Sequence, residues 1–142
     1  MEAYRVHEFG GIESIRREEI ASPTVSHGGV LIRIRAVSLN FRDLLMVKGL
    51  YNPKLKLPLI PTSDGAGEVT AVGEGVSQFK VGDRVLAGFF EGWIDGELND
   101  AKGRTARGGE IGGMLAQEVA TRAESLVRIP DHLSFEEAAT LP

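Results

Sequence analysis

The clearest hydrophobic pattern in the sequence is an alternation of apolar and charged residues within Val30–Ser38. Every second residue across Ile32–Ala36 is apolar, and the residues between them are Arg33 and Arg35. Side chains of a β-strand point alternately to its two faces. This period of two therefore predicts a strand with one buried face and one charged face.

Glycine and proline interrupt the rest of the chain, with 18 glycines and 6 prolines among 142 residues. Interruption at this frequency favours many short strands over long helices. Further strands are predicted between the turns, over Tyr4–Val6, Ser14–Ile20, Gly67–Val72, Arg84–Phe90, Met114–Thr121 and Ser125–Ile129. The pattern as a whole indicates a mainly β domain.

Two short helices are predicted from the residues at their ends. Asn40 precedes Phe41–Lys48 as an N-cap, Asp43 places an acid in the first turn, and Gly49 ends the helix. The spacing of serine and glutamate within Ser134–Glu137 is that of a capping box, so a second helix is expected to begin there.

Two segments lack any period. Glu91–Gly113 is long, polar and rich in glycine, and a loop of this length inside a domain is usually functional or mobile. Asn52–Pro61 contains three prolines and is expected to be an extended loop.

The composition excludes several classes of function. With no cysteine, the chain forms no disulfide, no iron–sulfur cluster and no thiolate zinc site. A net charge of −4 gives no general attraction to nucleic acid or to an anionic membrane. The apolar runs are far shorter than the roughly 18 residues of a membrane span. We therefore expect a soluble, cytoplasmic protein with no nucleic-acid or membrane partner.

Familiar catalytic motifs are also missing. Gly65–Thr70 and Gly73–Gln78 approach a G-x-G-x-x-G loop, but neither lies between a strand and a long helix, as dinucleotide binding requires. Ser63 lies outside any G-x-S-x-G elbow. The three histidines are far apart in the sequence, at His7, His27 and His132. No metal site is expected from them.

Polar residues do gather around the first predicted helix and before the strand that begins near Gly65. They are Asn40, Arg42, Asp43, Tyr51, Ser63 and Asp64. Each also has a purely structural explanation, because asparagine caps helices, an acid complements the helix dipole, and a Ser-Asp pair forms turns. The residues alone leave both interpretations open.

A series of segments in a fixed order adds a resemblance to a known family. The segments are Ser38–Asp43, Gly49–Tyr51, Pro58–Pro61, Ser63–Val69, Val72–Val76, Phe79–Val85, Leu115–Val119, Pro130 and Ser134–Pro142. Together they resemble the N-terminal catalytic domain of the medium-chain dehydrogenase/reductase superfamily, which includes alcohol dehydrogenases and quinone reductases. The resemblance extends from about Tyr4 to the last residue.

The resemblance implies a GroES-like, twisted, partly open β-barrel with a few short helices across residues 1–142. It implies a Rossmann nucleotide-binding domain after Pro142, and hence an isolated chain without activity. The implied reaction is hydride transfer between a nicotinamide, NADPH or NADH, and a small-molecule carbonyl, enone or quinone. A homodimer is compatible with it. The alternative is a free-standing GroES-like binding or assembly module with no catalysis.

Departures from the family pattern concern zinc. Asn40 stands where zinc-dependent members have a cysteine ligand, and Thr62–Asp64 stands where they have Gly-His-Glu. Glu91–Gly109, which corresponds to the structural zinc segment, contains no cysteine. The chain thus resembles the zinc-free branch, and no zinc is expected.

The resemblance also implies roles for the polar residues. Asn40, Tyr51 and Asp43 are expected as catalytic residues. Asn40, Arg42, Ser63 and Asp64 are expected beside the cofactor, and Tyr51 is expected on the substrate side.

Overall fold

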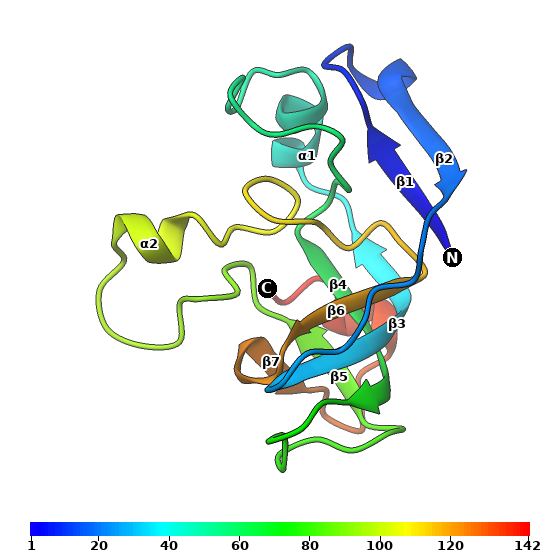
Figure 1. The fold of residues 1–142 in the computed structure, drawn as a ribbon, viewed down its shortest axis with the longest axis vertical. Coiled ribbons are helices and arrows are strands. Elements are labelled where there is room, and N and C mark those ends of the chain that lie inside the picture. Colours follow the sequence, from blue (N-terminus) through cyan, green and yellow to red (C-terminus); the bar gives the residue numbers. More distant parts are fainter.

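Seven strands and three short helices follow one another in the computed structural model, which describes residues 1–142 (Figure 1). The strands are β1 Glu2–Val6, β2 Ile15–Glu19, β3 Gly29–Ser38, β4 Asp64–Val72, β5 Arg84–Ala87, β6 Glu118–Arg122 and β7 Leu126–Arg128. The helices are α1 Phe41–Val47, α2 Asp100–Gly103 and α3 Phe135–Ala138. The predicted mainly β fold is confirmed.

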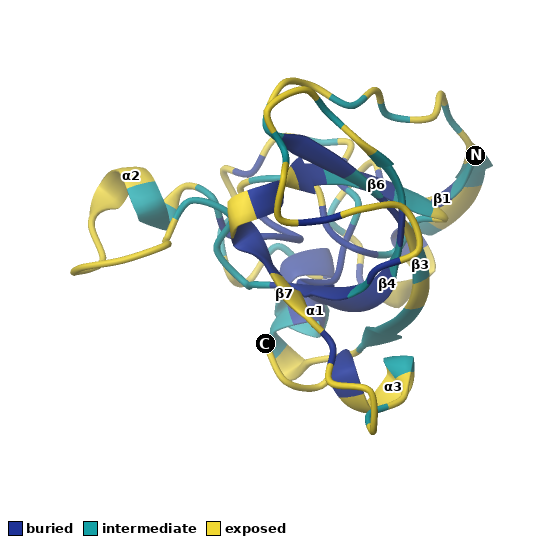
Figure 2. Cartoon of the chain, turned by 90° about the horizontal axis from the view of Figure 1, so that it is seen from below, coloured by how far each residue is buried: buried dark blue, intermediate teal, exposed yellow.

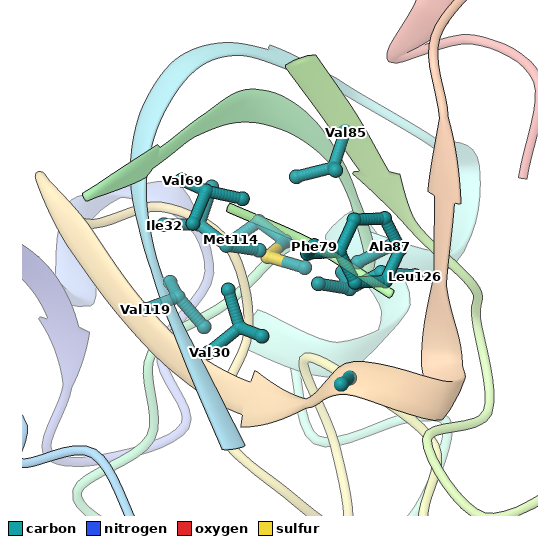
Figure 3. Packing of buried hydrophobic residues seen from close by; sticks show 10 residues of the cluster. Val30, Ile32, Val69, Phe79, Val85, Ala87, Met114, Val119 and Leu126 are labelled. Atoms are coloured by element: carbon teal, nitrogen blue, oxygen red, sulfur yellow. The ribbon is translucent and has the colours of Figure 1, made fainter. Parts of the chain in front are cut away.

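The strands form two antiparallel sheets. β1 and β2 make a hairpin, and the larger sheet has the order β6-β3-β4-β5-β7. The register between β3 and β4 shifts twice, between Leu31 and Ile32 and between Ile34 and Ala36. Such bulges bend and twist a strand. The larger sheet curls without closing, as a partly open GroES-like barrel does (Figure 3).

The curled sheet encloses the main hydrophobic core (Figure 3). Val30 and Ile32 of β3, Val69 of β4 and Val85 of β5 point into it, and Met114 fills its centre. Adjacent strand residues face opposite sides, so Leu86 packs instead in a second cluster with α3. The sheet is therefore covered on both faces where α3 docks.

The alternating pattern in β3 predicted its buried face correctly. Ile32 is buried, Ile34 is half-buried, and Arg33 and Arg35 are exposed. The N-cap at Asn40 and the capping box at Ser134–Glu137 are also confirmed.

Several predicted strands had wrong bounds: β1 and β4 begin earlier than predicted, at Glu2 and Asp64, and the strands predicted over Arg84–Phe90 and Met114–Thr121 are too long. β5 ends at Ala87, because Phe89 and Phe90 leave the sheet and pack against each other edge to face. β6 begins only at Glu118, because the preceding residues pair elsewhere: Tyr4 N–H donates to Leu115 O, and Ala3 bridges to Ala116. The segment before β6 thus joins the hairpin to the main sheet.

The predicted loop over Glu91–Gly113 contains one turn of helix, α2, which the sequence analysis missed. Asn99 caps this helix, and its side chain accepts a hydrogen bond from Lys102 N–H. α2 lies at the outer end of the molecule, and its residues Asp100 and Ala101 are exposed (Figure 2).

Candidate functional site

Asn40 links the start of α1 to the start of β4. Its side-chain Nδ2 donates a hydrogen bond of 2.6 Å to Asp64 Oδ2, and its backbone N–H donates one of 2.8 Å to Asp43 Oδ2. Asn40 itself is exposed, whereas both carboxylates are buried. Asn40 therefore binds one buried acid through its side chain and the other through its backbone, and it is the exposed residue of the cluster, where a ligand can reach.

The pKa of Asp43 depends on its surroundings in the cluster. Burial is the main cause that raises the pKa of Asp43, and the negative charge of Asp64 raises it further. The hydrogen bond from Asn40 N–H and the charge of Arg42 oppose this increase. One oxygen of each acid, Asp43 Oδ1 and Asp64 Oδ1, is buried without a hydrogen-bond partner. Unpartnered acceptors of this kind are costly, and they attract donors.

The chain makes an unusual turn immediately before β4. Thr62 has φ of 66°, a left-handed conformation that is rare for a β-branched residue, and its Oγ1 is buried without a partner. Two glycines pack against it: a Cβ at Gly108 would lie 2.6 Å from Thr62 O, and one at Gly113 would lie 2.2 Å from the same oxygen. Backbone outliers of this kind gather at functional sites. Ser63, next in the chain, is buried.

Arg42 and Tyr51 lie together at a separate cavity. The Arg42 guanidinium carbon is 4.8 Å from the centre of the Tyr51 ring and 4.8 Å from that of Phe89. Arg42 Nη1 donates a hydrogen bond of 3.0 Å to Arg107 O. The cavity has a volume of about 270 Å³. Its lining residues are Arg42, Met46, Tyr51, Asn52, Leu55, Phe89, Phe90, Gly103, Ala106, Gly109 and Glu110.

The structure thus divides the six predicted site residues. It joins Asn40, Asp43 and Asp64 by hydrogen bonds, with Ser63 adjacent to Asp64 in the chain. It places Arg42 and Tyr51 at the aromatic cavity.

Arg107 holds the segment behind this cavity, and the sequence analysis did not identify it. Its side chain is 1% exposed and donates hydrogen bonds to Gly88 O, Glu91 Oε2, Thr121 Oγ1 and Ser125 Oγ. Burial is the main cause that lowers its pKa, and Glu91 opposes that effect. An isolated arginine in a glycine-rich segment carries no sequence signal for such burial.

The histidines do not come together. His7 lies within 3.1 Å of Glu18 on the surface, and no group of three His, Cys, Asp or Glu side chains is arranged to hold a metal ion. No helix is long and apolar enough to cross a membrane.

The sequence of the sheet and loops matches a known family over residues 26–131, described as "Alcohol dehydrogenase GroES-like domain". The chain belongs to this family. The predicted resemblance to medium-chain dehydrogenases/reductases is confirmed.

Relatives of this GroES-like domain are longer than the chain. It is 43% identical over 141 residues to a zinc-type alcohol dehydrogenase-like protein of Schizosaccharomyces pombe, covering 98% of the chain and 41% of that protein. It is 35% identical over 148 residues to an alcohol dehydrogenase of Geobacillus stearothermophilus, covering 99% of the chain and 43% of that enzyme. The domain therefore spans about two-fifths of the length of these relatives.

Solved structures agree with the family assignment. An NAD-dependent alcohol dehydrogenase superimposes with a TM-score of 0.88 at 32% identity, over 100% of this chain and 43% of that one. Escherichia coli quinone oxidoreductase in complex with NADPH superimposes with a TM-score of 0.75 at 25% identity, over 98% of this chain and 36% of that one.

Proposed function

We propose that this GroES-like domain is the N-terminal catalytic domain of an NAD(P)H-dependent oxidoreductase that reduces a carbonyl, enone or quinone without zinc. The observation that carries the proposal is the hydrogen bond between Asn40 and Asp64. By resemblance, Asn40 stands where zinc-dependent members of the family carry a cysteine ligand, and Asp64 stands where they carry the glutamate of Gly-His-Glu. Here an amide–carboxylate pair occupies those positions.

A catalytic zinc ion does not fit the residues present. Such sites use three ligands from cysteine, histidine and carboxylates. Asn40 offers an amide, and its nitrogen is engaged with Asp64. The remaining position holds Ser63, which is a poor zinc ligand. We therefore assign no step of the reaction to a metal.

A nicotinamide fits the exposed side of Asn40. Beyond the N–H group that binds Asp64, this amide has a second N–H group and an oxygen that can bind a ribose hydroxyl or the substrate oxygen. Ser63 and Asp64 border the same position, and Arg42 borders it through the first turn of α1. When bound, the cofactor supplies the hydride from its C4 atom. We favour NADPH, the cofactor in the complex of the E. coli quinone oxidoreductase, and NADH is the alternative.

The chain's own contribution is polarisation of the substrate. Tyr51 lines the aromatic cavity and is more than half exposed, so its hydroxyl can donate to an oxygen that gains negative charge. Asn40 is a second neutral donor. Neutral donors stabilise an oxyanion less than a metal ion does, and this difference favours conjugated acceptors, which delocalise the charge themselves.

Names of relatives support this substrate range. They include alcohol dehydrogenase, quinone oxidoreductase and an acryloyl-coenzyme A reductase of Metallosphaera sedula that is 32% identical over 130 residues. We propose a small-molecule substrate, a cytoplasmic protein and a homodimer. We also propose that the nucleotide-binding Rossmann domain follows Pro142, because the relatives extend well beyond the matched region.

The test is oxidation of NADPH by the natural protein with 1,4-benzoquinone and with an enone, comparing Asn40→Ala with Asn99→Ala. Both residues are helix N-caps, but Asn99 lies at the exposed α2. We expect Asn40→Ala alone to lower kcat/KM at least about 10-fold, in the range of one lost transition-state donor. An equal loss of kcat/KM in both variants would mean that Asn40 acts only as a helix cap. A stable oligomer that binds partners and turns over none of these compounds would favour the free-standing module.

A further inference from the structure

Arg42 carries a positive charge that the protein leaves without an ion pair. Eight ion pairs occur in the structure, and none includes Arg42. Its cavity contains one carboxylate, Glu110, which accepts a hydrogen bond of 3.0 Å from Asn52 instead. A guanidinium is almost always charged, so the cavity has a positive group at Arg42 that does not pair with the carboxylate of Glu110.

The hydrogen-bonding groups of Arg42 are only partly used. Nη1 donates to Arg107 O, whereas Nε is buried without a partner and Nη2 has none within the protein. Nη2 approaches Gly109 closely, and any side chain there would displace it, since a Cβ would lie 2.7 Å from that nitrogen. The edge formed by Nε and Nη2 has the two parallel N–H donors that bind a carboxylate through both of its oxygens.

The aromatic rings hold this edge in place. The Tyr51 and Phe89 ring centres each lie 4.8 Å from the guanidinium carbon, and contacts with the faces of a guanidinium do not use its in-plane N–H groups. Met46, Leu55 and Ala106 make the adjoining walls apolar. A charge-assisted hydrogen bond is stronger in such surroundings than in water.

We infer that Arg42 binds a carboxylate of the substrate, and so makes the cavity selective for small enones or ketones that carry one. This inference rests on the proposed function for the reaction, and on the cavity alone for the anion. A volume of about 270 Å³ suits an acid of a few carbon atoms. Tyr51 stacks on Arg42, which places its hydroxyl beside the bound molecule.

Two matched pairs of compounds test the inference with the natural protein. For turnover, trans-4-oxo-2-pentenoate is compared with its methyl ester, because both have the same enone and only one is charged. For binding without reaction, levulinate is compared with methyl levulinate, using the NMR signal of the Arg42 Nε–H group. We expect kcat/KM for the acid, relative to the ester, to fall about 10- to 100-fold in Arg42→Met, the range for a lost charge-assisted pair.

Arg42→Lys and Arg104→Gln complete the comparison. Lysine keeps the charge without the parallel donors and should retain part of the preference for the acid. Arg104 is exposed near α2 and forms no ion pair, so its loss should leave the acid-to-ester ratio unchanged.

The outcomes separate the two proposals. A shift of the Nε–H signal with levulinate alone, without turnover of any enone, would support the anion site and contradict the proposed reaction. If both proteins turn over the enone and the ratio of kcat/KM for the acid to that for the ester is the same in wild type and Arg42→Met, the anion site is contradicted and the proposed reaction is supported. Weaker NADPH binding in Arg42→Met, with that ratio unchanged, would assign Arg42 to a cofactor phosphate and also overturn the inference.

Discussion

The side-chain amide of Asn40 lies 2.6 Å from the carboxylate of Asp64, across 24 residues of sequence. The same asparagine binds Asp43 through its backbone N–H. The charge of Asp64 raises the pKa of Asp43, and the hydrogen bond from Asn40 N–H lowers it, so Asn40 and Asp64 act on Asp43 in opposite directions.

Removing the charge of Asp64 should change the titration of its neighbour. In Asp64→Asn we expect the pKa of Asp43 to fall toward its ordinary value, because one of the charges that raise it is lost. The carboxyl ¹³C shift of Asp43, followed against pH, measures this. An unchanged pKa would mean that the charge of Asp64 does not act on Asp43.

The raised pKa of Asp43 makes a specific contribution to stability against pH. The folded state binds this proton more tightly than the unfolded state, so its contribution is favourable at low pH and is lost as pH rises from the ordinary pKa through the raised one. This contribution makes the Tm of the wild-type protein fall as the pH rises over that interval. Asp43→Asn should lack this part of the fall.

Asp83 provides the opposite control. The hydrogen bond from Lys80 N–H and the nearby Arg128 lower its pKa. Its contribution is present above the ordinary pKa and is lost as pH falls through the lowered one. In Asp83→Asn, the Tm should therefore decrease less than in wild type as the pH is lowered through the pKa of Asp83. A change of the same sign in both variants would contradict these assignments.

Two adjacent glycines should respond very differently to alanine. A Cβ at Gly113 would lie 2.2 Å from the carbonyl oxygens of both Pro61 and Thr62, whereas a Cβ at Gly112 meets nothing within 4 Å. We expect Gly113→Ala to destabilise the protein by about 3 kcal/mol or more, as overpacking against backbone does, and Gly112→Ala to change it by less than about 0.5 kcal/mol. Urea unfolding measures both.

Thr62→Gly should stabilise the protein. Glycine adopts a positive φ without the steric cost that threonine has at 66°, and the change also removes a buried hydroxyl that lacks a partner. We expect a gain of about 1 kcal/mol in the free energy of unfolding. Thr70→Gly, in the middle of β4, is the control and should lose stability. A loss at both positions would show that the Thr62 side chain contributes more by packing than its backbone costs.

Loss of Arg107 should be among the most destabilising single changes. Arg107→Met leaves Glu91, Thr121 and Ser125 without their common donor, and removal of one partner from a buried ion pair costs about 3 to 5 kcal/mol. Arg104→Met, at the exposed end of the same segment, should cost less than about 0.5 kcal/mol. Thermal unfolding distinguishes the two, and equal effects would contradict the role of the buried network.

Local patterns predicted the elements that local forces determine. The alternation in β3, the cap at Asn40 and the capping box at Ser134 each depend on residues a few positions apart. The pairing of Leu115 and Ala116 with β1 depends on a strand more than 100 residues earlier, so no local pattern reveals it. Burial of Arg107 and the contact of Arg42 with Phe89 have the same origin. The structure joins Asn40, Asp43 and Asp64 by hydrogen bonds and places Arg42 and Tyr51 at another cavity, a division that required the fold. The roles expected for these residues stay predictions.

The segment that carries α2 is closed at its base by Thr105. Its carbonyl accepts a hydrogen bond of 3.0 Å from Glu91 N–H, and its hydroxyl accepts one of 2.9 Å from Gly92 N–H. Between the residues joined by these two hydrogen bonds, most residues from Trp93 to Arg104 are exposed (Figure 2). Loops tolerate changes of length when their ends are fixed. This stretch is therefore a natural position for grafting a peptide tag or a fluorescent label, at a distance from the cluster around Asn40.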